Sequence, residues 1–233
     1  IMKECASMFY DPDFMNKLDQ NPYLLCFNNC VIDFKKKTER KGQPDDYISK
    51  CTNIDYIPYD ESKNYETMVQ INDFFKQLFP DDELRGYMWD HLASCCLGTN
   101  ENQTFNIYTG SGRNGKSKLV DLMTKCLGDY KGTVPITLIT QKRNSIGSTS
   151  SEIVQLKGTR YAVMQEPSKG DKINEGIMKE ITGGDPIQGR ALFKDTITFI
   201  PQFKLVVCTN TLFYIKSNDD GTWRRIRVCD FMS

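Results

Sequence analysis

The segment Gly-Ser-Gly-Arg-Asn-Gly-Lys-Ser at residues 110–117 constrains the fold of this chain more than any other part of its sequence. It fits the phosphate-binding pattern GxxxxGK followed by Ser or Thr at every position, after the apolar run 105–109 and before the helical pattern 116–127. Glycines in such a turn let backbone N–H groups and the helix N-terminus point at phosphate. The sequence therefore predicts a strand, a phosphate-binding loop and a helix, and both flanking elements disfavour a glycine-rich turn that binds nothing.

The side chains of this loop are expected to share the binding of a nucleotide and its metal ion. Lys116 would reach the β- and γ-phosphates, and the Ser117 hydroxyl would ligate Mg²⁺. ATP and Mg²⁺ are therefore the expected cofactors. The expected nucleotide-binding residues are Gly110, Ser111, Gly112, Arg113, Asn114, Gly115, Lys116 and Ser117.

Two later apolar runs each end in a polar residue that could act on the nucleotide. The run 161–164 is followed by Gln165 and Glu166, and Glu166 could act on the metal ion or orient the attacking water. The alternative for Glu166 is a carboxylate that faces solvent at the end of a strand. Asn210 follows the apolar run 203–208, where its side chain would point at the γ-phosphate, although an Asn there could equally form a turn.

The pattern of apolar residues divides the chain into three parts. From about residue 103, strands alternate with helices, which is typical of an α/β fold with a mostly parallel sheet flanked by helices. On both sides of Pro80, apolar residues recur at three- and four-residue spacing, which predicts two helices that could mediate assembly. We expect the end of a preceding domain at 1–60, the helical part at 61–98 and the nucleotide-binding core at 99–233. Within the first part, Asn28 and Asn29 predict a hairpin turn.

Composition narrows the expected compartment and partners. Lys and Arg number 30 and Asp and Glu number 30, so bulk charge favours neither nucleic acid nor membrane. No apolar run approaches the roughly 20 residues of a membrane span, and no secretory signal opens the chain, so an intracellular, reducing location is expected. We therefore interpret the nine cysteines as packing thiols, since Cys26 and Cys30 lack an evident second pair for zinc. The single histidine, His91, excludes a His-rich metal site.

The order of these motifs strongly resembles the superfamily 3 helicases, most closely the poxvirus-type primase-helicases of large DNA viruses. The resemblance is also carried by Lys-Glu-Ile-Thr-Gly-Gly-Asp-Pro-Ile-Gln-Gly-Arg-Ala-Leu-Phe-Lys at 179–194 and by Gly-Thr-Trp-Arg-Arg at 221–225. Before the core, residues 25–33 and 44–47 look like pieces of the viral domain that precedes the helicase. No primase motif set is visible, so a priming activity of the full protein would lie upstream of Ile1.

This resemblance implies an AAA+ ATPase core that assembles as a homo-hexameric ring and binds ATP between subunits. It implies a Walker A role for 110–117, a Walker B role for Glu166 and a sensor 1 role for Asn210. Arg224 and Arg225 match the arginine finger that a neighbouring subunit presents, with Arg225 as the first choice. Many members carry two acids at the Walker B position, whereas Gln165 precedes Glu166 here, so Glu166 would serve largely alone. The implied setting is viral DNA replication in the host cell, together with other replication proteins.

A predicted hairpin between the Glu166 strand and the Asn210 strand is the candidate DNA contact. Its expected tip is Phe193, Lys194 and Asp195, and in a ring six such tips would converge on the pore. There Lys194 could pair with a DNA phosphate and Phe193 could pack against sugar or base. The expected DNA-binding residues are Arg190, Phe193 and Lys194, and the alternative is a solvated hairpin lysine.

Three functions remain open at this point. The first is an ATP-driven hexameric DNA helicase, which the basic residue on the hairpin favours. The second is a DNA-packaging or protein-remodelling ATPase with the same motor. The third is a nucleotide-locked scaffold that does not hydrolyse ATP. A small-molecule kinase is disfavoured because nothing in the sequence resembles an acceptor lid.

Overall fold

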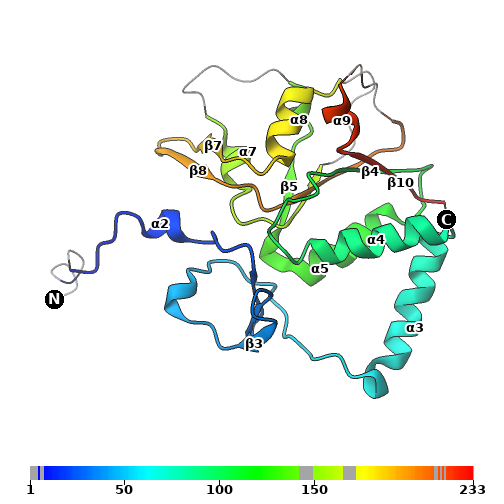
Figure 1. The fold of residues 1–233 in the computed structure, drawn as a ribbon, viewed down its shortest axis with the longest axis horizontal. Coiled ribbons are helices and arrows are strands. Elements are labelled where there is room, and N and C mark those ends of the chain that lie inside the picture. The colour runs from blue at the N-terminus through cyan, green and yellow to red at the C-terminus, as the bar shows by residue number, and fades with distance from the viewer. Residues whose placement is uncertain are drawn as a thin grey trace.

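A parallel sheet forms the centre of the molecule. The computed structural model describes residue 5 and residues 8–141, 149–164, 172–212, 215, 217 and 219–232. Within these residues the largest sheet has five strands in the order β10-β4-β9-β6-β5, and every pairing is parallel (Figure 1). The strands are β4 (Phe105–Thr109), β5 (Lys131–Val134), β6 (Tyr161–Met164), β9 (Lys204–Cys208) and β10 (Ile226–Asp230). The predicted α/β class with a mostly parallel sheet is confirmed.

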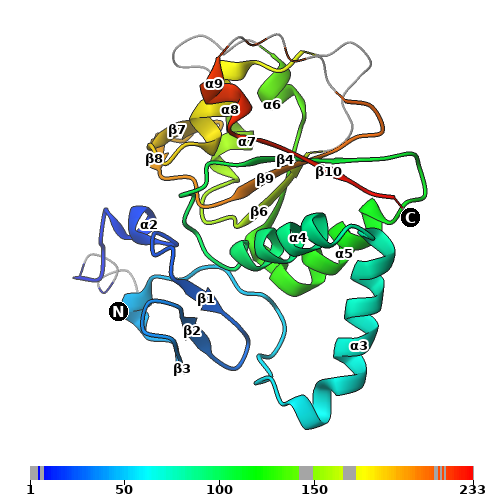
Figure 2. The same cartoon turned by 45° about the vertical axis from the view of Figure 1, so that its right-hand side comes forward.

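Helices cover both faces of this sheet, which explains why its strands are apolar almost throughout. Along β6, Tyr161 and Val163 pack into one hydrophobic cluster, and Ala162 and Met164 pack into the other. Figure 2 shows α4 and α5 below the sheet, and α6, α7 and α8 above it. These helices are α4 (Asp82–Ser94), α5 (Lys116–Leu127), α6 (Thr137–Thr140), α7 (Ser151–Val154) and α8 (Glu175–Thr182).

The two helices predicted around Pro80 are confirmed. The first is α3 (Glu61–Leu78), which begins at an N-cap where Asp60 accepts from the N–H of Ser62, and the second is α4. Helix α3 buries Phe75 and Leu78 near its C-terminal end, while its N-terminal half extends away from the core (Figure 1). A role of these helices in assembly stays a prediction.

The N-terminal part forms a small antiparallel sheet that packs against the core. It contains β1, β2 and β3, and the predicted turn at Asn28 and Asn29 joins the first two of these strands. Directly before β6, the buried guanidinium of Arg160 donates hydrogen bonds to the carbonyl oxygens of Asn21, Pro22 and Leu24. The elements of this part are α2 (Phe14–Lys17), β1 (Leu24–Cys26), β2 (Val31–Asp33), β3 (Thr38–Arg40) and η1 (Pro44–Asp46).

Four smaller elements complete the described fold. The predicted hairpin is confirmed as the antiparallel pair β7 and β8, in which Arg190 lies opposite Thr196. The short helix α9 precedes β10. The bounds are η2 (Gly128–Tyr130), β7 (Ile187–Arg190), β8 (Thr196–Phe199) and α9 (Asp220–Trp223). In the part of the chain that the structure describes, no helix has the length and apolar character needed to cross a membrane.

Candidate active site

The glycine-rich loop lies at the carboxyl end of β4, between that strand and α5. Two of its glycines adopt positive φ values, +140° at Gly110 and +84° at Gly115, a region that side chains with a Cβ rarely occupy. A Cβ on Gly110 would clash with the side chain of Asn114 and would lie 2.6 Å from the carbonyl oxygen of Phe231. Glycine at position 110 is therefore required for this loop to close.

Lys116 places its ammonium group at the centre of the loop. Its Nζ donates to the carbonyl oxygen of Gly110 at 2.7 Å and to Asn114 Oδ1 at 3.1 Å. The same Nζ donates to Asn210 Oδ1 at 3.1 Å. Strands β4 and β9 are parallel neighbours with Tyr108 opposite Cys208, so the residues that follow them meet at one edge of the sheet. The structure thus brings together the loop lysine and the Asn that the sequence placed beside the γ-phosphate.

Asn114 joins the loop to the end of β10. It is buried, its Oδ1 accepts from Lys116, and its Nδ2 donates to the carbonyl oxygen of Phe231 at 3.2 Å. The sequence singled out this residue as part of a motif, without this role. Because Phe231 lies 117 positions away, the contact has no local sequence signal.

The start of α5 is suited to an anionic ligand. Its first residue is preceded by Gly115, and no side chain caps the helix there, so the first-turn N–H groups have no side-chain acceptor. Ser117 is exposed at this end of the helix, as are Ser111, Gly112 and Arg113 of the loop. An uncapped helix N-terminus, a lysine ammonium and an exposed hydroxyl fit the phosphates and the metal ion of a nucleotide.

The carboxylate predicted to complete the metal site cannot be described. Gln165 and Glu166 lie outside the described residues. Strand β6 ends at Met164, which pairs with Val207 of β9, so it ends on the same edge of the sheet as the loop. Among the residues that the structure describes, no group of three or more His, Cys, Asp or Glu side chains is arranged to hold a metal ion.

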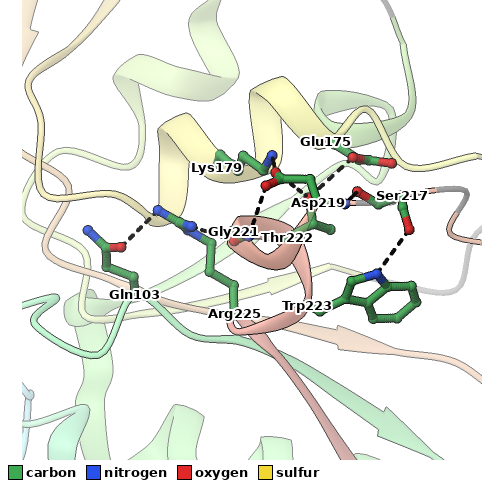
Figure 3. Close-up of polar contacts among 9 residues, drawn as sticks. All are labelled: Gln103, Glu175, Lys179, Ser217, Asp219, Gly221, Thr222, Trp223 and Arg225. Carbon is green, nitrogen blue, oxygen red and sulfur yellow. Dashed lines mark hydrogen bonds and ion pairs between the residues drawn. The ribbon is translucent and has the colours of Figure 1, made fainter.

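The two candidate finger arginines differ sharply in their surroundings, and Figure 3 shows those of Arg225. Arg225 is 9% exposed, and its guanidinium donates to the carbonyl oxygen of Gly221 and, at 2.8 Å, to Gln103 Oε1. Burial, together with the neighbouring Arg224, lowers the pKa of the Arg225 guanidinium. Arg224 is exposed and donates to the same Gln103 Oε1 at 2.6 Å. No sequence signal identified Gln103, which holds both arginines.

These arginines lie at the opposite end of β4 from the glycine-rich loop. The N–H of Phe105, the first residue of β4, donates to the carbonyl oxygen of Arg225 at 2.7 Å. The strand then runs to Thr109 before the loop begins, a span of roughly 13 Å at about 3.3 Å per residue. Within one chain, the structure therefore does not bring Arg224 or Arg225 to Lys116.

The hairpin of β7 and β8 presents its tip to solvent. Phe193 is 92% exposed and has a φ of +58°, and Lys194 beside it is also exposed. Arg190 braces the tip, because its Nε donates to the carbonyl oxygen of Lys194 at 3.1 Å. Its backbone N–H donates to Ser150 Oγ at 3.0 Å, which ties the tip-side end of β7 to the start of α7. Of the three candidate DNA contacts, Phe193 and Lys194 lie at the tip and Arg190 supports it.

Replacing Gly110 with alanine should destabilise the loop, whereas the same change at Gly112 should not. A Cβ at position 110 meets Asn114 and Phe231 at a positive φ, so we expect the free energy of unfolding to fall by more than about 1 kcal/mol. A Cβ at position 112 meets no atom within 4 Å, so Gly112→Ala is a matched control in the same loop. Denaturant unfolding of both variants measures the difference. Equal stability of the two variants would contradict the loop geometry.

The chain matches two family models. Residues 1–91 match the model described as "D5 N terminal like". Residues 108–225, just over half of the chain, match the model described as "Family of unknown function (DUF5906)". The chain belongs to this family.

Relatives of the chain come from large DNA viruses. "Putative helicase L207/L206" of Acanthamoeba polyphaga mimivirus is 48% identical over the whole chain, which covers 24% of that protein. "Putative helicase 121R" of Invertebrate iridescent virus 3 is 35% identical over the whole chain, which covers 25% of it. "Putative primase C962R" of African swine fever virus (isolate Warthog/Namibia/Wart80/1980) is 26% identical over 97% of the chain, which covers 24% of it. The chain thus spans about a quarter of the length of these relatives, and its resemblance to viral primase-helicases is confirmed.

Solved structures share the fold of this family member at low sequence identity. The A form apo structure of the NrS-1 C-terminal region matches with a TM-score of 0.55 and 15% identity, covering 69% of this chain and 36% of that chain. The apo structure of NrS-1 C-terminal residues 305–718 matches with a TM-score of 0.54 and 15% identity, covering 69% of this chain and 38% of that chain. At this level of identity the likeness concerns the fold alone.

Proposed function

We propose that this chain is the ATPase core of a superfamily 3, AAA+ DNA helicase that works as a homo-hexameric ring in viral DNA replication. The observation that carries the proposal is the contact of Lys116 Nζ with both Gly110 and Asn210 at the carboxyl ends of β4 and β9. The connection that follows β4 runs to β5 at one edge of the sheet, and the connection that follows β9 runs to β10 at the opposite edge. In open α/β sheets, ligands bind where the connections diverge in this way.

Each site residue has a distinct part in the proposed reaction. Bound ATP with Mg²⁺ supplies the phosphoanhydride bond whose hydrolysis drives the motor. The N–H groups of the loop and the Lys116 ammonium bind and orient the phosphates. The Ser117 hydroxyl and the Glu166 carboxylate would hold the metal ion, and Glu166 would also orient the water. Asn210 fixes the position of Lys116 from the neighbouring strand.

An arginine from a neighbouring subunit completes the proposed site. The arginines lie at the far end of β4 from their own loop, which is compatible with action in trans. Arg225 was the first choice for the finger on sequence grounds, but its guanidinium is buried against Gly221 and Gln103. Its exposed neighbour Arg224 is therefore the proposed finger, and Arg225 supports the segment that presents it.

DNA is the proposed partner of the hairpin tip, and Lys194→Ala tests this role. Removing one phosphate contact should leave basal ATP hydrolysis and ring formation nearly intact. It should weaken single-strand binding, reduce the salt slope of binding by about one per contact, and abolish unwinding. Binding titrations at several salt concentrations and a forked-duplex assay measure these effects. The matched control is Lys118→Ala, an exposed lysine on α5 away from the hairpin.

Two outcomes would argue against this proposal. Unwinding by Lys194→Ala at the wild-type rate would remove the hairpin lysine from the DNA path and favour a packaging or remodelling ATPase. Equal losses in Lys194→Ala and Lys118→Ala would indicate a general effect of surface charge. With the helicase role, we also propose an intracellular viral replication compartment and other replication proteins as partners.

A further inference from the structure

Two short helices that are distant in sequence are joined by side chains directly beside the finger segment. Lys179 of α8 forms an ion pair with Asp219, which caps α9 (Figure 3). The hydroxyl of Thr222 in α9 donates to Glu175 Oε2 in α8 at 3.2 Å. We call these two interactions the α8–α9 contact. It joins segments about 40 residues apart and has no assigned role in the proposed reaction.

At one end of the α8–α9 contact, α8 leads into the hairpin of β7 and β8, the proposed DNA contact. Met178, Ile181 and Thr182 of α8 are buried, so the helix is anchored in the core on that side. Strand β7 begins at Ile187, five residues after the helix ends, and continues to the hairpin tip. A displacement of the tip is therefore transmitted toward α8 through a short segment.

At the other end, α9 carries the finger segment. A helix of four residues has little stability of its own, so the contacts at its ends determine its position. Asp219 pairs with Lys179 and also accepts from the N–H of Gly221 at 3.0 Å, and these two contacts, the first above all, hold the pKa of Asp219 below its ordinary value. Thr222 is fully buried, and Arg224 follows the helix directly. A shift of α8 would therefore move the residue that we propose as the finger.

We propose that the α8–α9 contact couples DNA binding at the hairpin tip to the position of Arg224, and that Lys179 is its positioning residue. The proposal rests on the proposed function. An exposed ion pair contributes little to folding, about 0–1 kcal/mol, so Lys179 is not required to keep the fold. Arg224 also donates to Gln103, and this hydrogen bond does not involve Lys179. Without DNA, Gln103 therefore keeps Arg224 in place, and basal hydrolysis does not need the α8–α9 contact. With DNA, displacement of the hairpin reaches the finger through Lys179 and Asp219.

The test compares ATP hydrolysis with and without single-stranded DNA in the intact protein. Lys179→Met removes the charge and keeps the length of the side chain. We expect its basal rate and DNA affinity to stay near wild type, while the stimulation by DNA falls by about five-fold or more, as expected for loss of a coupling between sites. Lys179→Arg keeps the charge and should restore stimulation. Asp219→Asn keeps the helix cap and loses the ion pair, so it should resemble Lys179→Met.

A matched control separates coupling from a general loss of surface charge. Lys125 pairs with Asp121 within α5, so Lys125→Met removes an exposed ion pair that joins no two elements. It should keep full stimulation by DNA. Unchanged stimulation in Lys179→Met, or equal losses of basal and stimulated rates, would overturn the coupling. A wild-type protein whose ATPase does not respond to DNA would overturn the proposed function as well, so the two failures can be told apart.

Discussion

Replacing Lys116 with alanine should reduce ATP hydrolysis to background while the fold remains intact. The change removes the ammonium that Gly110, Asn114 and Asn210 hold at the mouth of the loop. Loss of one group that stabilises the transferring phosphoryl charge lowers a rate by roughly 10²–10³-fold, and Lys116 also binds the phosphates in the ground state. Steady-state phosphate release measures the rate, and circular dichroism checks the fold.

The neighbouring lysine of the same helix provides the control for this variant. Lys118 is exposed on α5, two residues beyond Lys116. Lys118→Ala should hydrolyse ATP at the wild-type rate. Near-normal turnover in Lys116→Ala would remove the phosphate-loop assignment and, with it, the proposed roles of Asn210 and Ser117.

Arg224→Ala should lower ATP hydrolysis by roughly 10³–10⁵-fold, the effect of removing an arginine finger. Each subunit would keep an intact loop but would present no finger to its neighbour. Mixing Arg224→Ala subunits with Lys116→Ala subunits should therefore recover part of the activity, since some interfaces would pair an intact loop with an intact finger. Hydrolysis measured across a series of mixing ratios reports the recovery.

Two further arginines of the same segment serve as comparisons. Arg227→Ala removes an exposed guanidinium that donates to the backbone carbonyl oxygens of Arg224 and Ile226, so it should leave the rate near wild type. Arg225→Ala should lower stability as well as activity, because it removes the buried contacts with Gly221 and Gln103. An absence of recovery at every mixing ratio, with mixed rings shown to form, would contradict a role for Arg224 in trans.

The parts of the fold that depend on local sequence could be predicted closely. The strand at 105–109 and the helix at 116–127 have the bounds expected from the glycine-rich motif, because a phosphate loop needs both flanking elements. The hairpin between Arg190 and Thr196 was also expected, although the sequence did not show that Arg190 braces the tip. In both cases the residues that predict the element lie within it or next to it in the sequence.

Contacts between distant segments could not be predicted from the sequence. Asn114 donates to the carbonyl oxygen of Phe231 because β10 pairs with β4. That pairing depends on the strand order of the whole sheet. Arg224 and Arg225 are identical neighbours in the sequence, and the fold buries Arg225 while it leaves Arg224 exposed. Both donate to Gln103, about 120 residues earlier. Arg160 likewise lies directly before a strand that the sequence predicted, yet its guanidinium holds the N-terminal part of the chain against the core.

Unwinding of a forked DNA duplex by the intact protein tests the central claim most directly. With ATP and Mg²⁺, we expect the wild-type protein to separate the strands, and we expect no separation with a non-hydrolysable ATP analogue or with the Lys116→Ala variant. ATP hydrolysis without strand separation on any fork would contradict the helicase assignment and favour a packaging or remodelling ATPase. ATP binding without turnover would contradict the motor itself.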